Sequence, residues 1–311
     1  MGGGYYSDDT YRRSRSTRQE KGEDDFQYSE DNIASKKVHP NLDPLRISSK
    51  PYGKLESRDN NDHPESNAVL MCLDVTGSNI DRARIVQKKL PTLMELVQKY
   101  LKDPQIAIAA NDDFRVQPEM CVQISDFESD NRIDEHIRSL ILVGDGGGNS
   151  GESYDLLLYA AARKTVLDCM EKRSKKGYLF MYADEPLRTL VKKSEVKRVF
   201  GDALEENILI ERIIAEAKAL YHVYLLSTVR PEYSAGPQYR ELFGEDSVIT
   251  IQHPDMICEV VGATIGFNEE LISQKEAVKS LVRVGMDRSD ADALALQLAA
   301  KVRRPKGRLS A

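Results

Sequence analysis

The chain has 311 residues and a formal net charge of -6, from 44 Lys and Arg against 50 Asp and Glu. This length can bury one large core or two smaller ones. The acidic balance gives no bulk attraction to nucleic acid, and the sequence contains no run of about 18 apolar residues that could span a membrane. The 4 cysteines lie far apart without metal-ligand spacing, so we expect reduced, buried thiols. The N-terminus has no signal-peptide pattern, so a cytoplasmic protein is expected.

The first 67 residues differ in composition from the rest of the chain. Residues 7–31 are dense in charge, serine and tyrosine, and such a segment buries too little apolar surface to fold alone, so disorder or an extended arm is expected. Residues 39–64 contain four prolines among scattered apolar residues, which indicates an extended segment lying across a folded body. The interleaved acids argue against an arm that binds nucleic acid.

Beyond this segment the chain alternates between apolar runs and amphipathic stretches. Residues 68–73 are continuously apolar, as is typical of a strand buried on both faces. Residues 80–101 have apolar side chains at helical spacing, and Pro91 is expected to kink or split the helix. Residues 105–111 and 119–125 resemble strands separated by a gap short enough for a hairpin, which predicts one antiparallel strand.

Similar patterns continue to the C-terminus. Helices are expected over residues 130–142, 153–171, 205–220, 254–265, 269–284 and 289–302, and strands over residues 176–183, 222–227 and 247–251. The alternation predicts an α/β fold with an open, mostly parallel, doubly wound (Rossmann-like) sheet, one antiparallel strand and helices on both faces. We expect three parts: a partly disordered, partly extended arm over 1–67, the sheet domain over 68–267, and C-terminal helices with a basic tail over 268–311. The last two helices either cap the sheet domain or dock a partner.

Oxygen-bearing side chains follow the expected strands at three points. Asp74, Thr76 and Ser78 alternate along the loop after the first strand, so their oxygens can point the same way. A glycine-rich loop over 144–153 precedes a helix, and Asp184 directly follows another strand. Ligands of such folds bind beyond the carboxyl ends of strands where the strand order reverses, so the three loops are expected to converge there.

A hard cation such as Mg²⁺ takes oxygen ligands and keeps some of its waters. The oxygen set that the three loops offer is Asp74, Thr76, Ser78, Asn149 and Asp184. Taken singly, Asp74 could simply end a strand, Ser78 and Asp184 could cap helices, and Asn149 could be a turn residue. Chance convergence of all three loops at strand ends explains the pattern less well than a cation site does.

These residues resemble a known family. Asp-x-Thr-x-Ser over 74–78, a glycine-rich loop before a helix and an acid after the next strand look like a von Willebrand factor type A (vWA) domain, whose metal-ion-dependent adhesion site (MIDAS) uses those three loops. The resemblance covers roughly residues 68–267. Residues 39–44 and 127–132 also resemble stretches of uncharacterised bacterial and phage-encoded members. The resemblance implies a vWA fold and a site for Mg²⁺ or Mn²⁺.

By position, the resemblance implies that Thr76 and Ser78 bind the metal directly, while Asp74 and Asp184 act mostly through waters. The chain departs from the family in the second loop, where a threonine is usual. Other oxygen-bearing side chains must serve there, and the candidates are Asn149, Ser150, Glu152 and Ser153.

The resemblance also implies a binding module without catalytic residues. A metal held by mostly neutral oxygens keeps an open position, which an acidic side chain of a partner protein can fill. Intracellular domains of this type often serve as adaptors for ATPase machines or as assembly factors. We therefore expect a protein partner of that kind, and neither nucleic acid nor membrane.

Two other interpretations stay open. Residues 74–78 are close to the Asp-Lys-Thr-Gly-Thr of aspartyl-phosphate enzymes, and residues 144–146 resemble a loop of haloacid-dehalogenase-like phosphatases, in which Asp74 would be the nucleophile. Val75 in place of the usual lysine argues against that reading. Alternatively, the chain is a structural component of a larger assembly with a vestigial site. The three interpretations predict different properties. An enzyme would turn over phosphoesters, an adaptor would bind a metal ion and a partner protein, and a protein with a vestigial site would bind neither.

Overall fold

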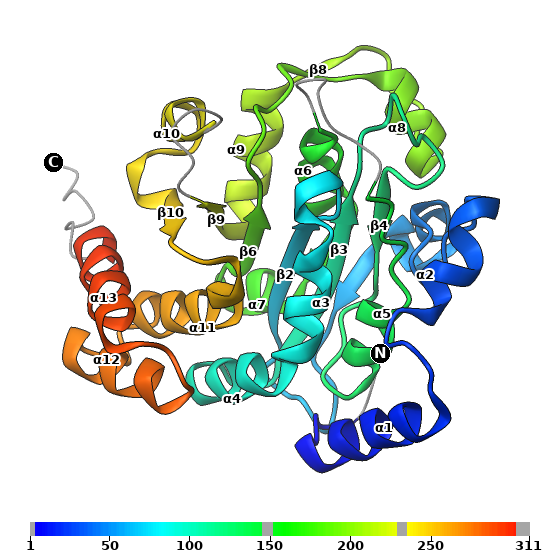
Figure 1. Ribbon diagram of the computed structural model, residues 1–311. Helices are drawn as coiled ribbons and strands as arrows, with labels where there is room; N and C mark the ends of the chain where they lie inside the picture. Colours follow the sequence, from blue (N-terminus) through cyan, green and yellow to red (C-terminus); the bar gives the residue numbers. More distant parts are fainter. Residues whose placement is uncertain (1–3, 145–151, 229–234, 303–311) are drawn as a thin grey trace, which may run out of the picture.

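The computed structural model describes residues 4–144, 152–228 and 235–302 (Figure 1). Its centre is a six-stranded sheet in the order β10-β9-β6-β2-β3-β4. The strands are β2 (Asn67–Asp74), β3 (Pro104–Asn111), β4 (Val122–Ile124), β6 (Gly177–Tyr182), β9 (Tyr221–Thr228) and β10 (Val248–Ile251). All neighbours pair in parallel except β3 and β4. The predicted α/β class, the mostly parallel sheet and its one antiparallel strand are confirmed.

The central strand β2 is buried on both faces, as its continuous apolar run predicts. Val69, Met71 and Leu73 belong to the core on one face of the sheet. Ala68, Leu70 and Cys72 belong to the core on the other face. A strand with apolar side chains on both faces requires helices on both sides of the sheet, because the side chains of each face must be shielded from water.

Two groups of helices supply that cover. One group, which also includes the C-terminal pair, contains α3 (Asp81–Lys88), α4 (Leu90–Tyr100), α5 (Arg132–Arg138), α11 (Ile257–Asn268), α12 (Gln274–Arg283) and α13 (Arg288–Val302). The other contains α6 (Tyr154–Arg163), α7 (Asp168–Arg173), α8 (Lys193–Phe200), α9 (Ile210–Leu220) and α10 (Gly236–Phe243). Both α12 and α13 contribute to the core beside α11, so they pack on the sheet domain (Figure 1).

Several element boundaries differ from the sequence patterns. Pro91 splits the segment 80–101 into α3 and α4, as expected. The single helix predicted over 153–171 is wrong, because Thr165–Leu167 forms a strand, β5, between α6 and α7. This strand pairs in parallel with β1 (Leu55–Ser57), so a partner far away in the sequence overrides the local helical spacing. Similarly, β8 (Ile208–Leu209) pairs with β7 (Leu190–Val191), which delays the start of α9.

The charged N-terminal segment forms a helix where a disordered or extended arm was expected. Helix α1 (Asp8–Lys21) begins with a Ser7 side chain that accepts a hydrogen bond from the Thr10 amide and ends at a left-handed Gly22. Tyr11 is only 3% exposed, and its hydroxyl donates to the Gln87 carbonyl at 2.9 Å. The expectation fails because one buried tyrosine and well-formed caps anchor a helix whose composition alone does not favour folding.

The segment 39–64 lies across the body of the domain. Leu42 and Ile47 are fully buried, and the Leu42 carbonyl accepts a hydrogen bond from the Ile124 amide at 2.9 Å. This contact covers the outer edge of β4, which would otherwise present unpaired backbone groups at the edge of the sheet.

The thiols have the state that the sequence predicts. All four cysteines are free and buried. Within the described ranges, no helix combines the length and apolarity that crossing a membrane requires.

Replacement of Leu42 by Ala is expected to destabilise the protein by about 2–5 kcal/mol, because it removes buried methyl groups and leaves a cavity over β4. Urea unfolding followed by circular dichroism measures the change. The matched control is Leu45→Ala in the same segment: Leu45 is 48% exposed, so a change within about 0.5 kcal/mol is expected. Equal effects of the two substitutions would show that the segment does not stabilise the domain.

Candidate functional site

The candidate site lies where the strand order of the sheet reverses. The chain moves from β2 to β3 and β4 on one side, and then returns to β6, β9 and β10 on the other. The carboxyl ends of β2 and β6 are therefore neighbours at the point where such folds bind ligands. Asp74 is the last residue of β2, and Asp184 follows the end of β6.

Hydrogen bonds join the loops after these two strands. The Asn79 side-chain amide donates to both carboxylate oxygens of Asp184, at 3.1 and 3.0 Å. Asn79 ends the short 3-10 turn Gly77–Asn79, directly after the Asp-x-Thr-x-Ser motif. The predicted convergence of the first and third loops is therefore present in the structure.

The start of α6 is joined to the same place through Asp74. The Asp74 carboxylate is fully buried, and one of its oxygens, Oδ1, accepts hydrogen bonds from the Thr76 amide at 2.8 Å and the Thr76 hydroxyl at 2.6 Å. Its other oxygen, Oδ2, accepts from the hydroxyl of Tyr154, the first residue of α6. The start of α6, which follows the glycine-rich segment in the sequence, is therefore hydrogen-bonded to the end of β2.

The structure places only part of the predicted ligand set. Asp74, Thr76 and Asp184 are brought to one edge of the sheet. Ser78 has its backbone in the 3-10 turn, but its side chain lies outside the described part of the structure. Asn149, the remaining predicted ligand, falls in the segment 145–151 outside the described residues, together with Ser150.

The two described alternatives in the second loop differ in their surroundings. The Ser153 hydroxyl oxygen accepts a hydrogen bond from the Phe114 amide at 2.9 Å, so it already anchors the loop after β3. Glu152 is 3% exposed, and its Oε2 has no hydrogen-bond partner among the described residues. Burial, together with the negative charges of Asp74 and Asp112, raises the pKa of Glu152 to about 9.

Asp74 is also buried among other acidic side chains. Burial raises its pKa to about 6, although the Thr76 and Tyr154 hydrogen bonds oppose the shift, and the Asp184 charge adds to it. Carboxylates that raise one another's pKa in a buried position favour a bound cation, because a cation compensates the negative charge that burial would otherwise penalise.

Sequence reasoning missed three residues that shape the site. Arg82 donates to the Asn79 side-chain oxygen at 3.2 Å, and its guanidinium lies 4.9 Å from the centre of the Tyr182 ring. This contact fixes the orientation of the Asn79 amide, so that its nitrogen faces Asp184. Only the position of Asn79 next to the motif could have signalled its role. Nothing in the sequence distinguishes Tyr154 from an ordinary core tyrosine.

The side chains at the site determine which ligands it could bind. Among the residues that the structure describes, no three His, Cys, Asp or Glu side chains form a group that could hold a metal ion. The donors at this edge of the sheet are carboxylate, hydroxyl and amide oxygens, the ligand types that hard cations such as Mg²⁺ take. Asn111, the partner of Asp74 in the β2–β3 register, is fully buried with no hydrogen-bond partner for its side-chain amide in the described ranges. A hydrated cation would supply such a partner.

Comparison with known proteins leaves the family unassigned. No protein-family model and no curated protein matches the chain. Among solved structures, the pilus adhesin SpaC from Lactobacillus rhamnosus GG in its open conformation matches with a TM-score of 0.44 and 10% identity, over 68% of this chain and 31% of that chain. Proximal thread matrix protein 1 from the mussel byssus matches with a TM-score of 0.43 and 10% identity, over 66% of this chain and 48% of that chain. The chain therefore spans less than half of the length of either protein.

Replacement of Glu152 by Gln is expected to flatten the dependence of stability on pH. The pKa of Glu152 is higher in the folded state than in the unfolded state, so the folded protein binds the extra proton, and this stabilisation is lost as the pH rises from about 4.5 towards 9. Wild type should lose stability progressively over this range in metal-free buffer, and Glu152→Gln should lose markedly less.

Urea unfolding at several pH values measures both curves. The matched control is Glu211→Gln on the exposed surface of α9, which should follow the wild-type curve. Parallel curves for wild type and Glu152→Gln would contradict the electrostatic description of the site.

Proposed function

We propose that the chain is a metal-dependent protein-binding module of the vWA type. In this proposal Mg²⁺ or Mn²⁺ binds beyond the carboxyl ends of β2 and β6, and an acidic side chain of a partner protein completes its coordination. The observation that carries the proposal is the hydrogen-bonded unit in which Asp74, Thr76 and Tyr154 join Asn79 and Asp184 at the point where the strand order reverses.

The hydrogen bonds favour distinct roles for the two residues of the motif. The Thr76 hydroxyl donates a hydrogen bond to the Asp74 carboxylate, so the lone pairs of the Thr76 oxygen remain available to a cation. Asp74 accepts three hydrogen bonds, which suits a carboxylate that orients Thr76 and metal-bound water and does not itself contact the metal. In the proposal Ser78 supplies a second hydroxyl.

Asp184 and the second loop complete the proposed set. The Asn79 amide occupies both oxygens of Asp184 in the way that metal-bound waters would, so metal binding competes with this contact. From the second loop, Asn149 remains the proposed ligand by position. Of the two described alternatives, Glu152 fits better than Ser153, because the Ser153 oxygen already accepts the Phe114 amide.

The same contacts argue against a phosphotransfer enzyme. A nucleophilic carboxylate needs an oxygen that can reach phosphorus, but Asp74 is fully buried and both of its oxygens accept hydrogen bonds. We therefore propose a binding function without catalysis. The partner is a protein that presents an acidic residue, such as an ATPase or assembly component of the cytoplasm.

Mg²⁺ and Mn²⁺ are expected to bind weakly in the absence of a partner carboxylate, with a dissociation constant of roughly micromolar to millimolar, because the ligands come from separate loops. Isothermal titration calorimetry measures the affinity. Thr76→Val, which keeps the shape of the side chain and removes its oxygen, should abolish binding. The control Thr264→Val removes a buried hydroxyl on α11, away from the site, and should leave binding unchanged.

Equal binding by wild type and Thr76→Val would contradict the metal assignment. Release of phosphate from ATP or acetyl phosphate that disappears in Asp74→Asn would instead favour the enzyme interpretation.

A partner protein should be recovered from cell extract by the wild-type chain in Mg²⁺ and lost in EDTA. Its recovery should also fail with Thr76→Val, because the open metal position would be missing. Affinity capture followed by mass spectrometry makes the comparison, with Thr264→Val as the control. Partners that are identical in all conditions would contradict metal-dependent recognition and favour a vestigial site.

A further inference from the structure

A groove runs along α4 at the opposite end of the strands from the candidate metal site. Two cavities of about 440 and 610 Å³ adjoin there, and both are lined by Lys99, Tyr100 and Leu271. The groove reaches Pro104, where β3 begins, whereas the metal site lies beyond the ends of β2 and β6. The eight residues of β3 separate the two ends by roughly 26 Å.

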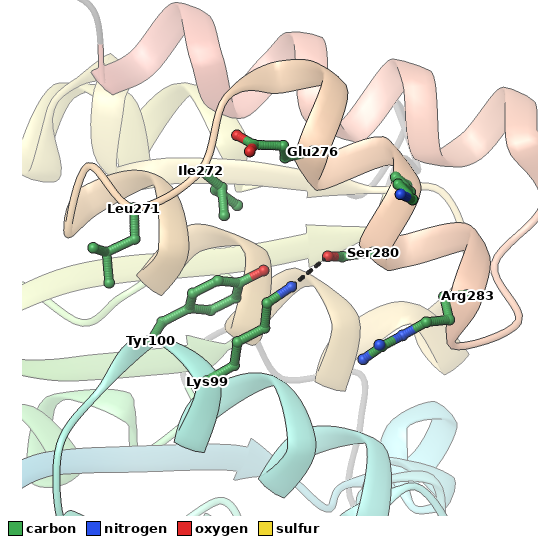
Figure 2. A pocket seen from close by; sticks show the side chains of 8 residues that line it. Lys99, Tyr100, Leu271, Ile272, Glu276, Ser280 and Arg283 are labelled. Atoms are coloured by element: carbon green, nitrogen blue, oxygen red, sulfur yellow. Dashed lines mark hydrogen bonds between the residues drawn. The ribbon is translucent and has the colours of Figure 1, made fainter.

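The floor of the groove is apolar. Tyr100 is 5% exposed, and Ile272 and Leu271 come from the segment that leads from α11 into α12. Figure 2 shows Tyr100 and Ile272 lying between the two helices, with the Tyr100 hydroxyl pointing towards α12. That hydroxyl is buried and has no hydrogen-bond partner in the described part of the chain. Leu271 is 57% exposed, so the groove displays a large apolar side chain to solvent.

The rim of the groove carries positive charge that its own acids do not balance. Lys99 donates to the Ser280 hydroxyl at 2.8 Å, which is a neutral partner (Figure 2). Lys279 also lines the groove, and within the described ranges neither lysine forms an ion pair. Two acids line the groove against four basic side chains, Lys99, Lys102, Lys279 and Arg283. Glu276 accepts hydrogen bonds from Ser273 in the capping box of α12, so its charge already stabilises the helix N-terminus. Asp103 accepts a hydrogen bond from the Glu65 amide at 2.9 Å.

Charge excludes two other occupants. The chain's own C-terminal segment, 303–311, carries four basic residues and no acid, so it would be repelled by the lysines. Nucleic-acid surfaces neutralise many phosphates along a basic face, whereas this groove offers a few basic side chains above an apolar floor on a chain of net charge -6. An apolar floor between cations instead fits a peptide that has apolar side chains between carboxylates.

We propose that this groove between α4 and α12 docks an acidic segment of a partner protein, with an apolar side chain on Tyr100 and Leu271 and carboxylates on Lys99 and Lys279. This docking site is independent of the proposed metal function. Binding to it needs no divalent cation, so EDTA separates the two interactions.

The test uses the full chain in EDTA and a fluorescein-labelled peptide, Gly-Asp-Asp-Leu-Leu-Asp-Asp-Gly, followed by fluorescence anisotropy. A dissociation constant of roughly 10–100 μM is expected, and binding should weaken as salt is raised from about 50 to 300 mM. Two comparison peptides, one with asparagines in place of the aspartates and one with alanines in place of the leucines, should each bind at least about tenfold more weakly.

The variants assign the binding to the groove. The double variant Lys99→Gln and Lys279→Gln, and separately Leu271→Ala, should each weaken binding of the labelled peptide by about tenfold or more. All three positions are exposed, so the fold should be retained, and thermal unfolding by circular dichroism checks this. The matched control is Lys197→Gln on the exposed face of α8, which should leave binding unchanged.

Four results of the binding measurements would overturn the proposal. These are failure of the peptide to bind at about 1 mM, equal binding by the asparagine peptide, equal binding by the groove variants, and tighter groove-dependent binding of a 12-nucleotide single-stranded DNA. The last result would assign the groove to nucleic acid. Sedimentation of the unliganded chain adds a further check, because a dimer that the double variant dissociates would assign the groove to a second copy of the chain and overturn the proposal as well.

Discussion

The arrangement of the candidate site depends on one buried carboxylate. Asp74 has no exposed surface, and a buried carboxylate is tolerated only when its oxygens accept hydrogen bonds. The donors come from Thr76 in the following loop and from Tyr154 at the start of α6, so meeting this requirement fixes both segments against β2. Asn79 and Arg82 extend the same network to Asp184 and the loop after β6.

The network also explains how acids can gather at this edge of the sheet. Burial and the charges of nearby acids, Asp74 and Asp184 among them, raise the pKa of Glu152, and the Arg82 guanidinium donates to the Asn79 side chain. The hydrogen bonds that Thr76, Tyr154 and Asn79 donate to Asp74 and Asp184 come from neutral side chains, whereas ion pairs hold other acids of the molecule. Arg188, for example, pairs directly with Asp155 and Glu195.

The sequence predicted those parts of the fold that depend on neighbouring residues. The apolar run of β2, the break at Pro91 and the position of Asp74 at a strand end are all local, and the structure has each of them. The pairing of β1 with β5 joins segments far apart in the chain, and the role of Tyr154 depends on the packing of α6 against β2. The spacing of apolar residues along the sequence does not reveal contacts between distant segments. For this reason the helical spacing over 153–171 predicted one long helix.

The N-terminal segment has a consequence for the order in which the protein assembles. Its contacts reach far along the chain: Ser7 bonds to Asn131, 124 residues away, and Ser29 bonds to Leu142, 113 residues away. On the ribosome, the amino end therefore emerges well before the residues that it packs against have been synthesised. These residues can reach their native positions only after their partners have been made, and until Leu42 docks on Ile124 the edge of β4 stays open to pairing with other nascent chains.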